Sequence, residues 1–75
     1  MKKKHRMVMR TKARSIRGLV NVLQSDAEYV FTDVEGFDII SLGESLRELK
    51  CTLNDLVDSV AELEYALYLS NSEDA

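Results

Sequence analysis

Residues 39–67 read IISLGESLRELKCTLNDLVDSVAELEYAL, and this stretch decides the fold. Apolar side chains recur along it at intervals of three and four residues, which is the spacing of one helical face rather than the alternation of a strand. The members of this helix-pairing seam are Ile39, Leu42, Leu46, Leu49, Leu53, Leu56, Val60, Leu63 and Leu67. Ser41 and Glu44 have the spacing of a capping box. We therefore predict a long heptad-patterned helix over 42–69, followed by a tail over 70–75.

The positions beside the seam argue against an exposed two-stranded zipper. With Ile39 at heptad position a, the g positions hold Asp38, Ser45, Thr52, Ser59 and Ala66. These small side chains cannot build the interhelical salt bridges of such a zipper. A DNA-binding zipper also needs a continuous helix from its basic region, and Gly36 interrupts that path. The pattern instead indicates a broad face packed against other helices in a bundle or dimer.

A second pattern with the same spacing lies near the N-terminus. Its apolar members are Met9, Ala13, Ile16, Val20, Leu23 and Ala27. This spacing predicts an amphipathic helix over 8–24, and we expect residues 1–7 to form a flexible basic arm.

The segment between the two predicted helices allows two interpretations. Residues 29–34 are rich in β-branched and aromatic side chains, and Glu35-Gly36 offers a two-residue turn, so we favour a short β-hairpin within 28–41. In the alternative, the 3–4 spacing continues through Val30 and Val34, and the chain forms a helical hairpin that turns at Gly36. Either way, the 75 residues are expected to form one small, mainly α-helical domain.

The inventory of reactive side chains excludes most catalytic chemistry. The chain has one cysteine, Cys51, and one histidine, His5, and lacks a nucleophile–base pair and a glycine-rich phosphate loop. We therefore predict no enzyme, no metal site and no cofactor. A single unpaired cysteine is typical of a reducing compartment, and no apolar run reaches the roughly 20 residues of a membrane span. We expect a cytoplasmic protein without membrane association.

The charges are separated along the chain. Residues 1–25 carry eight basic side chains and no acid, whereas residues 26–75 carry all thirteen acids and two basic side chains. Such a segment could contact phosphates or an acidic protein surface. The candidate residues for that contact are Lys2, Lys3, Lys4, Arg6, Arg10, Lys12, Arg14 and Arg17. No aromatic residue precedes Tyr29, so the segment lacks the stacking groups of single-strand binders.

An Arg-rich, acid-free start also resembles a transit peptide, but such a peptide would take a third of the chain, and we do not predict one.

Two further surfaces are predicted on the long helix. An acidic ridge opposite the seam comprises Glu44, Glu48, Asp55, Asp58 and Glu62. A second patch near the C-terminal end comprises Tyr65, Tyr68 and Leu69, which cannot reach the seam. We expect these residues to pack under the N-terminal helix or a second chain, and the alternative is an exposed partner site.

Protein–protein interaction is the function that these features favour. Most of the apolar surface is patterned for helix packing, and a chain of this length has a thin core that a partner would complete. The sequence therefore predicts a small regulator or inhibitor that binds a larger protein stoichiometrically, as a homodimer or in a tight heterocomplex. The alternative is a nucleic-acid-binding dimer that uses the basic segment.

Overall fold

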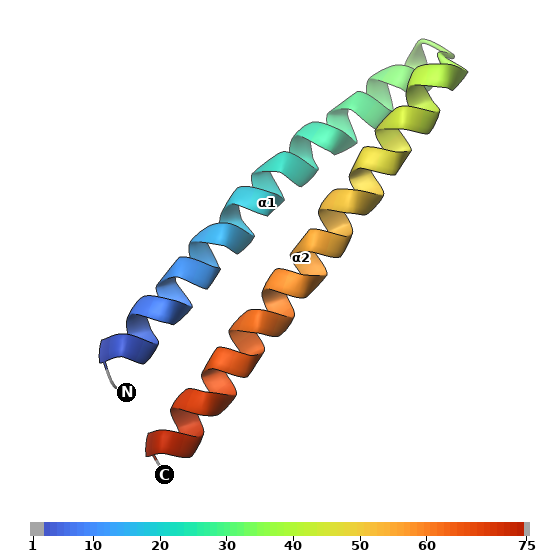
Figure 1. Ribbon diagram of the computed structural model, residues 1–75. Coiled ribbons are helices and arrows are strands. Elements are labelled where there is room, and N and C mark those ends of the chain that lie inside the picture. The colour runs from blue at the N-terminus through green and yellow to red at the C-terminus, as the bar shows by residue number, and fades with distance from the viewer. Residues whose placement is uncertain (1–2, 75) are drawn as a thin grey trace.

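The computed structural model describes residues 3–74, which form two long α-helices joined by a tight turn. Helix α1 spans Lys3–Glu35 and helix α2 spans Ile39–Asp74. The helices lie antiparallel and side by side, with the N- and C-terminal ends together at one end of a rod (Figure 1). The predicted mainly α-helical fold and the long C-terminal helix are confirmed. That helix extends beyond both ends of the predicted range 42–69.

The predicted β-hairpin is wrong, because residues 3–74 contain no strand and α1 continues through Tyr29–Val34. The β-branched and aromatic residues there have only a weak local preference for strands, and packing decides the outcome. As helix, the segment places Val30 and Asp33 against α2, where both side chains are half-buried. The chain therefore adopts the helical hairpin that was the alternative interpretation.

The turn between the helices is closed by backbone and side-chain hydrogen bonds. The N–H of Gly36 donates to the carbonyl of Thr32 at 2.9 Å, and the N–H of Asp38 donates to the carbonyl of Asp33 at 3.0 Å. Phe37 lies between them with a φ of 54°, in the left-handed region that favours glycine. The Oδ1 atom of Asp38 accepts from the N–H of Ser41 at 3.1 Å. Asp38 therefore caps α2, which explains why the helix begins before the predicted capping box.

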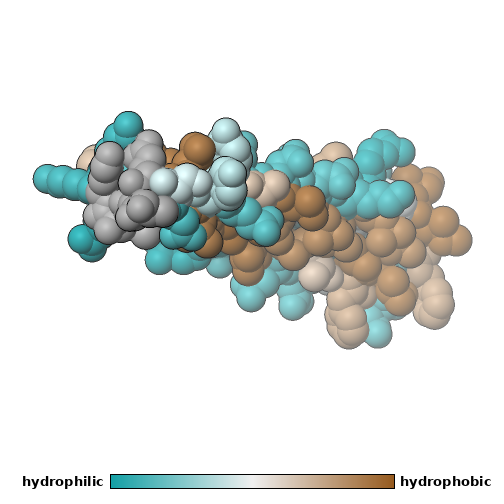
Figure 2. All heavy atoms as spheres, turned by 90° about the horizontal axis from the view of Figure 1, so that it is seen from below, coloured by the Kyte–Doolittle hydropathy of each residue, from teal (hydrophilic) through white to brown (hydrophobic). Residues whose placement is uncertain are grey.

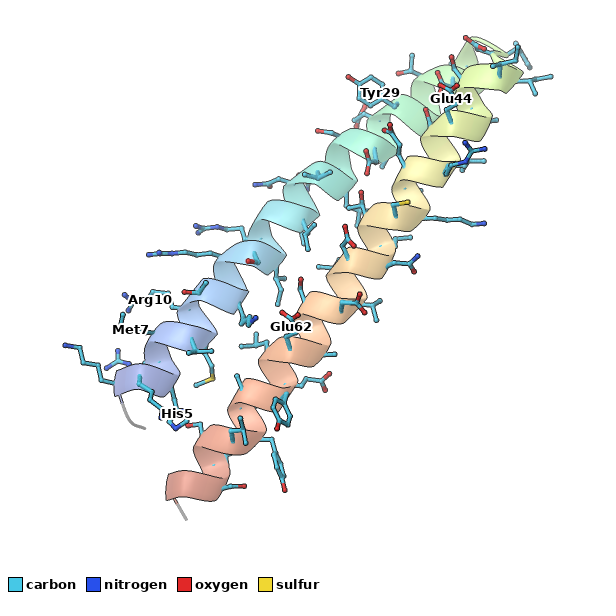
Figure 3. All side chains as sticks on the ribbon, viewed as in Figure 1. His5, Met7, Arg10, Tyr29, Glu44 and Glu62 are labelled. Atoms are coloured by element: carbon cyan, nitrogen blue, oxygen red, sulfur yellow. The ribbon has the colours of Figure 1, made fainter. Side chains whose placement is uncertain are left out.

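The N-terminal residues belong to α1 rather than to a separate arm. The helix begins at Lys3, so the described part of the predicted arm is the first part of α1. Lys2 lies outside the described residues. His5, only 7% exposed, points from α1 toward the end of α2 (Figure 3). Packing against α2 explains why the helix extends so far toward the N-terminus.

The contact between the helices is thin and contains polar groups. Among the described residues, no apolar side chain is buried, whereas four polar ones are more than nine-tenths buried: His5, Asp26, Thr52 and Ser70. The apolar part of the contact consists of half-buried side chains, which in α1 are Met9, Ile16, Leu19, Leu23 and Val30. A two-helix rod of this kind lacks the enclosed apolar core that stabilises most small domains.

Candidate interaction surfaces

The predicted helix-pairing seam is divided by the fold into two rows. One row, which we call the inner row, is half-buried against α1 and consists of Leu42, Leu49, Leu56 and Leu63. The other, which we call the side row of α2, is 41–46% exposed and consists of Leu46, Leu53, Val60 and Leu67. The first member of the predicted seam, Ile39, is 80% exposed at the turn.

Small and hydroxyl-bearing residues of α2 determine which row faces α1. Beside the inner row stand Ser45, Thr52, Ser59 and Ala66, all turned toward α1 and at least half-buried. The hydroxyl of Thr52 donates to the carboxylate of Asp26 at 2.7 Å, and that of Ser45 donates to Asp33 at 2.5 Å. Asp26 is only 7% exposed, and a buried carboxylate without a donor is costly. When the inner row faces α1, its hydroxyl-bearing neighbours therefore donate hydrogen bonds to Asp26 and Asp33. The side row is purely apolar and could not supply these donors.

Helix α1 has a side row of its own, Ala13, Val20, Ala27 and Val34, which is also exposed. A shallow hollow contains Val22 of α1 together with Asp55 and Glu62 of α2, which marks one side of the rod. In α1, Val20 precedes Val22 by two residues, and in α2, Leu53 precedes Asp55 by two. Two residues correspond to about 200° around a helix, so both side rows lie on the opposite side of the rod from the hollow. Together they form one surface, the side face.

The side face brings exposed apolar residues of both helices to one side of the rod. Seen from below, hydrophobic residues gather over the middle and far part of the rod, with hydrophilic residues around them (Figure 2). Contiguous apolar surfaces of this kind mark sites of contact with other molecules.

The predicted acidic ridge follows the other side of the rod. Its members Glu44 and Glu48 border a hollow that Tyr29 of α1 also lines, and Tyr29 and Glu44 lie close together near the turn (Figure 3). Asp55, Asp58 and Glu62 border the next hollow along α2. All five carboxylates are exposed, and Glu62 accepts a hydrogen bond from the ammonium group of Lys12 at 2.8 Å.

The predicted basic stripe is only partly assembled. Arg10, Arg14 and Arg17 line one shallow depression together with Ala13, on the outer surface of α1. Lys12 is turned away from them toward α2, where it pairs with Glu62. Lys3, Lys4 and Arg6 are exposed at the start of the helix. The structure therefore concentrates the accessible cations of the middle of α1 into three arginines.

The patch predicted near the C-terminal end of α2 is exposed within the single chain. Tyr65 and Tyr68 are each nearly two-thirds exposed, and Leu69 is partly covered. Cys51 is exposed on the same helix. Among residues 3–74, no group of three His, Cys, Asp or Glu side chains could hold a metal ion.

The turn carries an exposed apolar group that the sequence interpretation did not single out. Phe37, Ile39 and Ile40 are 88, 80 and 81% exposed, the highest values among the large apolar side chains of the described chain. We call these three residues the tip. The residues around them are acidic: Asp33, Glu35, Asp38 and Glu44. The predicted β-hairpin concealed this site, because it assigned Phe37 and Ile39 to a strand.

The buried polar residues of the seam were also missed. Asp26 and Thr52 come from different helices, and their pairing depends on the register of the hairpin. The small residues at the g positions were the available signal, because they indicated close packing on that side of the inner row.

Residues 3–74 contain no helix that is long and apolar enough to cross a membrane. Comparisons of the chain with protein-family models, with curated proteins and with solved structures found no match.

Proposed function

We propose that the protein is a small non-catalytic regulator or inhibitor that binds one larger protein stoichiometrically, with the tip as its principal contact. The observation that carries this proposal is the exposure of the tip residues Phe37, Ile39 and Ile40. Large apolar side chains that protrude together are typical of the anchors that dominate protein–protein binding energy. The tip contributes little to the fold, so its composition is best explained by a partner.

The backbone of the turn supports the same proposal. Phe37 adopts a φ of 54°, which costs a residue with a Cβ atom roughly 1–2 kcal/mol. Glycine would remove that cost, and the glycine of this turn occupies the preceding position, where the φ is not positive. A strained residue that is also highly exposed, as Phe37 is, is a candidate for function rather than for stability.

The acids around the tip indicate the chemistry of the partner. Asp33, Glu35, Asp38 and Glu44 surround the tip in the sequence and across the turn. Complementary charges favour a partner whose apolar pocket has a basic rim, and they would accelerate the encounter more than they tighten the complex.

Crosslinking in the native host tests the proposal. A photoreactive phenylalanine analogue placed at Phe37 should join the chain to one larger protein in a 1:1 product. The same analogue at Asn54, an exposed position of α2 that is distant from the tip, serves as the matched control and should give no such product. The Phe37 product should be unchanged after nuclease treatment. Equal crosslinking from both positions, or recovery that depends on nucleic acid, would contradict the proposal.

The second candidate function, nucleic-acid binding, is favoured by one observation, the cluster of Arg10, Arg14 and Arg17. Truncating the basic segment is a poor test, because His5 is buried against α2. Replacing the three arginines with glutamine removes the charges and keeps good helix formers. If phosphates are bound, the log–log salt slope for duplex DNA should shrink by about 0.7–0.9 per lost contact. Replacement of Arg47 and Lys50, on α2, is the control. Our proposal expects no tight DNA binding by the unmodified chain.

A further inference from the structure

We infer that the side face is covered by a second copy of this chain, which produces a four-helix dimer with both tips at the same end. This inference goes beyond the proposed function, because it concerns a different surface from the tip. The side face consists of Ala13, Val20, Ala27 and Val34 of α1 and of Leu46, Leu53, Val60 and Leu67 of α2.

The flat side of the hairpin on which the side face lies is large enough for such a contact. It measures 56 Å by 14 Å, an outline of roughly 800 Å² and about the area that each partner buries in a standard interface, and the side rows occupy about 32 Å of its length at 1.5 Å per residue. Covering the side face would also bury apolar side chains that a single hairpin leaves exposed to water, since no apolar residue of the described chain is buried. A four-helix bundle is the common way in which long helices of this kind enclose a core.

The two side rows differ in volume, and this difference makes the face complementary to itself. The α1 row alternates alanine with valine, whereas the α2 row is mostly leucine. Even packing requires large residues to face small ones. When a two-fold axis runs along the rod, α1 of each copy lies on α2 of the other, and every small row meets a large row. Reversing one copy would instead place the two leucine rows together, which leaves the packing uneven. The volumes therefore favour the arrangement with both tips at one end.

The charges at the edge of the side face agree with this arrangement. On α2, the row next to the side row contains one basic and one acidic residue, Lys50 and Glu64. The hydrogen bond between Asp26 and Thr52 shows which levels of the two helices are adjacent. At the level of Lys50, α1 carries Glu28, and at the level of Glu64 it carries Arg14. In the dimer, each α2 charge would therefore lie beside the opposite charge on the other copy, which supports pairing of like chains.

The first part of the test measures mass by sedimentation equilibrium over a concentration series. The unmodified protein should be a dimer at micromolar concentration. The double variant Val20→Lys/Leu53→Lys places charges in the side face and should weaken self-association by at least about tenfold. Its matched control, Val22→Lys/Leu69→Lys, changes the same residue types, which are exposed to a similar extent outside the side face, and should remain dimeric.

Each outcome of the sedimentation measurements either supports or overturns the dimer. Loss of the dimer in the first variant alone supports the inference, whether or not the separated chains remain helical, because Val20 and Leu53 belong to the exposed side rows of the single hairpin. A monomeric unmodified protein would overturn it. So would a dimer that survives the side-face substitutions, or one that both double variants disrupt equally.

The second part measures the orientation with a single spin label near the turn, at Glu35→Cys in a Cys51→Ser background. With both tips at one end, the two labels should lie within roughly 30 Å, about two layers of helices. A distance approaching the 56 Å length of the hairpin would show the reversed arrangement and overturn the stated orientation. Crosslinking from Phe37 to a larger protein does not depend on this result, so the dimer and the proposed function can fail separately.

Discussion

Leu53 and Leu56 are neighbours on α2, and the sequence pattern assigns both to the helix-pairing seam. In the hairpin, however, their side chains lie in different surroundings. Leu56 belongs to the inner row and is half-buried against α1, whereas Leu53 belongs to the side row and is 42% exposed. The difference does not come from the leucines. It comes from their neighbours, because the hydroxyl-bearing residues that accompany the inner row satisfy Asp26 and Asp33 of the other helix. Polar groups therefore select one of two equally apolar rows.

The largest expected effect comes from truncating the two rows in turn. Leu56→Ala should destabilise the protein by about 2–3 kcal/mol, the lower part of the range for leucine truncation, since the side chain is half-buried. Leu53→Ala should cost less than about 1 kcal/mol in dilute protein, and more as the concentration rises and the side face becomes covered. Urea unfolding at several protein concentrations measures both. Equal losses at every concentration would remove the distinction between the rows.

The next effect tests whether the polar pairs select the row. Thr52→Val should cost about 1–3 kcal/mol, because the buried carboxylate of Asp26 loses its donor. Replacing both residues, as in Asp26→Leu/Thr52→Val, should recover much of that loss. Double-mutant analysis of unfolding free energies provides the measurement. Ser45→Ala is the weaker counterpart, because Asp33 is only half-buried. An additive double mutant would show that the pair is not coupled.

This comparison also shows how far the sequence determined the fold. The 3–4 spacing of leucines predicts α2 and its apolar character, and the small residues such as Ser59 and Ala66 indicate close packing beside them. The pairing of Asp26 with Thr52 joins residues 26 positions apart, which local patterns cannot reveal. The error over residues 28–41 has a similar origin. The strand preference of Tyr29–Val34 is local, and contacts with α2 outweigh it.

The candidate sites were predictable to a lesser extent. The cations of residues 3–17 could be found from composition. The ion pair between Lys12 and Glu62 could not be predicted without knowing the antiparallel register of the two helices. The tip escaped detection because its exposure arises from the position of the turn. Phe37 would have been covered in a strand pair, whereas a helical hairpin projects it into solvent.

A smaller effect is expected at the turn, where stability and binding should separate. Phe37→Gly should stabilise the fold by about 0.5–1 kcal/mol, because glycine accepts the positive φ without steric cost. The same change should weaken partner binding, since it removes the most exposed residue of the tip. Gly36→Ala is the control: its added Cβ would meet the Thr32 carbonyl at 3.4 Å, an ordinary contact. Destabilisation by Phe37→Gly, measured by urea unfolding, would contradict this account of the turn.

The smallest effect is expected for Cys51→Ser. The thiol is exposed and lies on neither the inner row nor the side row, so the unfolding free energy should change by less than about 0.5 kcal/mol. Self-association should also remain unchanged in sedimentation experiments. A loss of dimer on this substitution would place the thiol at the contact between chains and would require a different face from the one proposed.

The central claim is that α2 has one row covered within the chain and another covered only by a second molecule. Solution NMR of the leucine and valine methyl groups, with a soluble paramagnetic probe, tests it directly. The inner row, represented by Leu49 and Leu56, should be protected from the probe at every protein concentration. The side row, represented by Leu46 and Leu53, should be relaxed in dilute samples and become protected as the concentration rises. Side-row methyl groups that stay accessible at all concentrations, or inner-row methyl groups that the probe reaches equally well, would contradict the account.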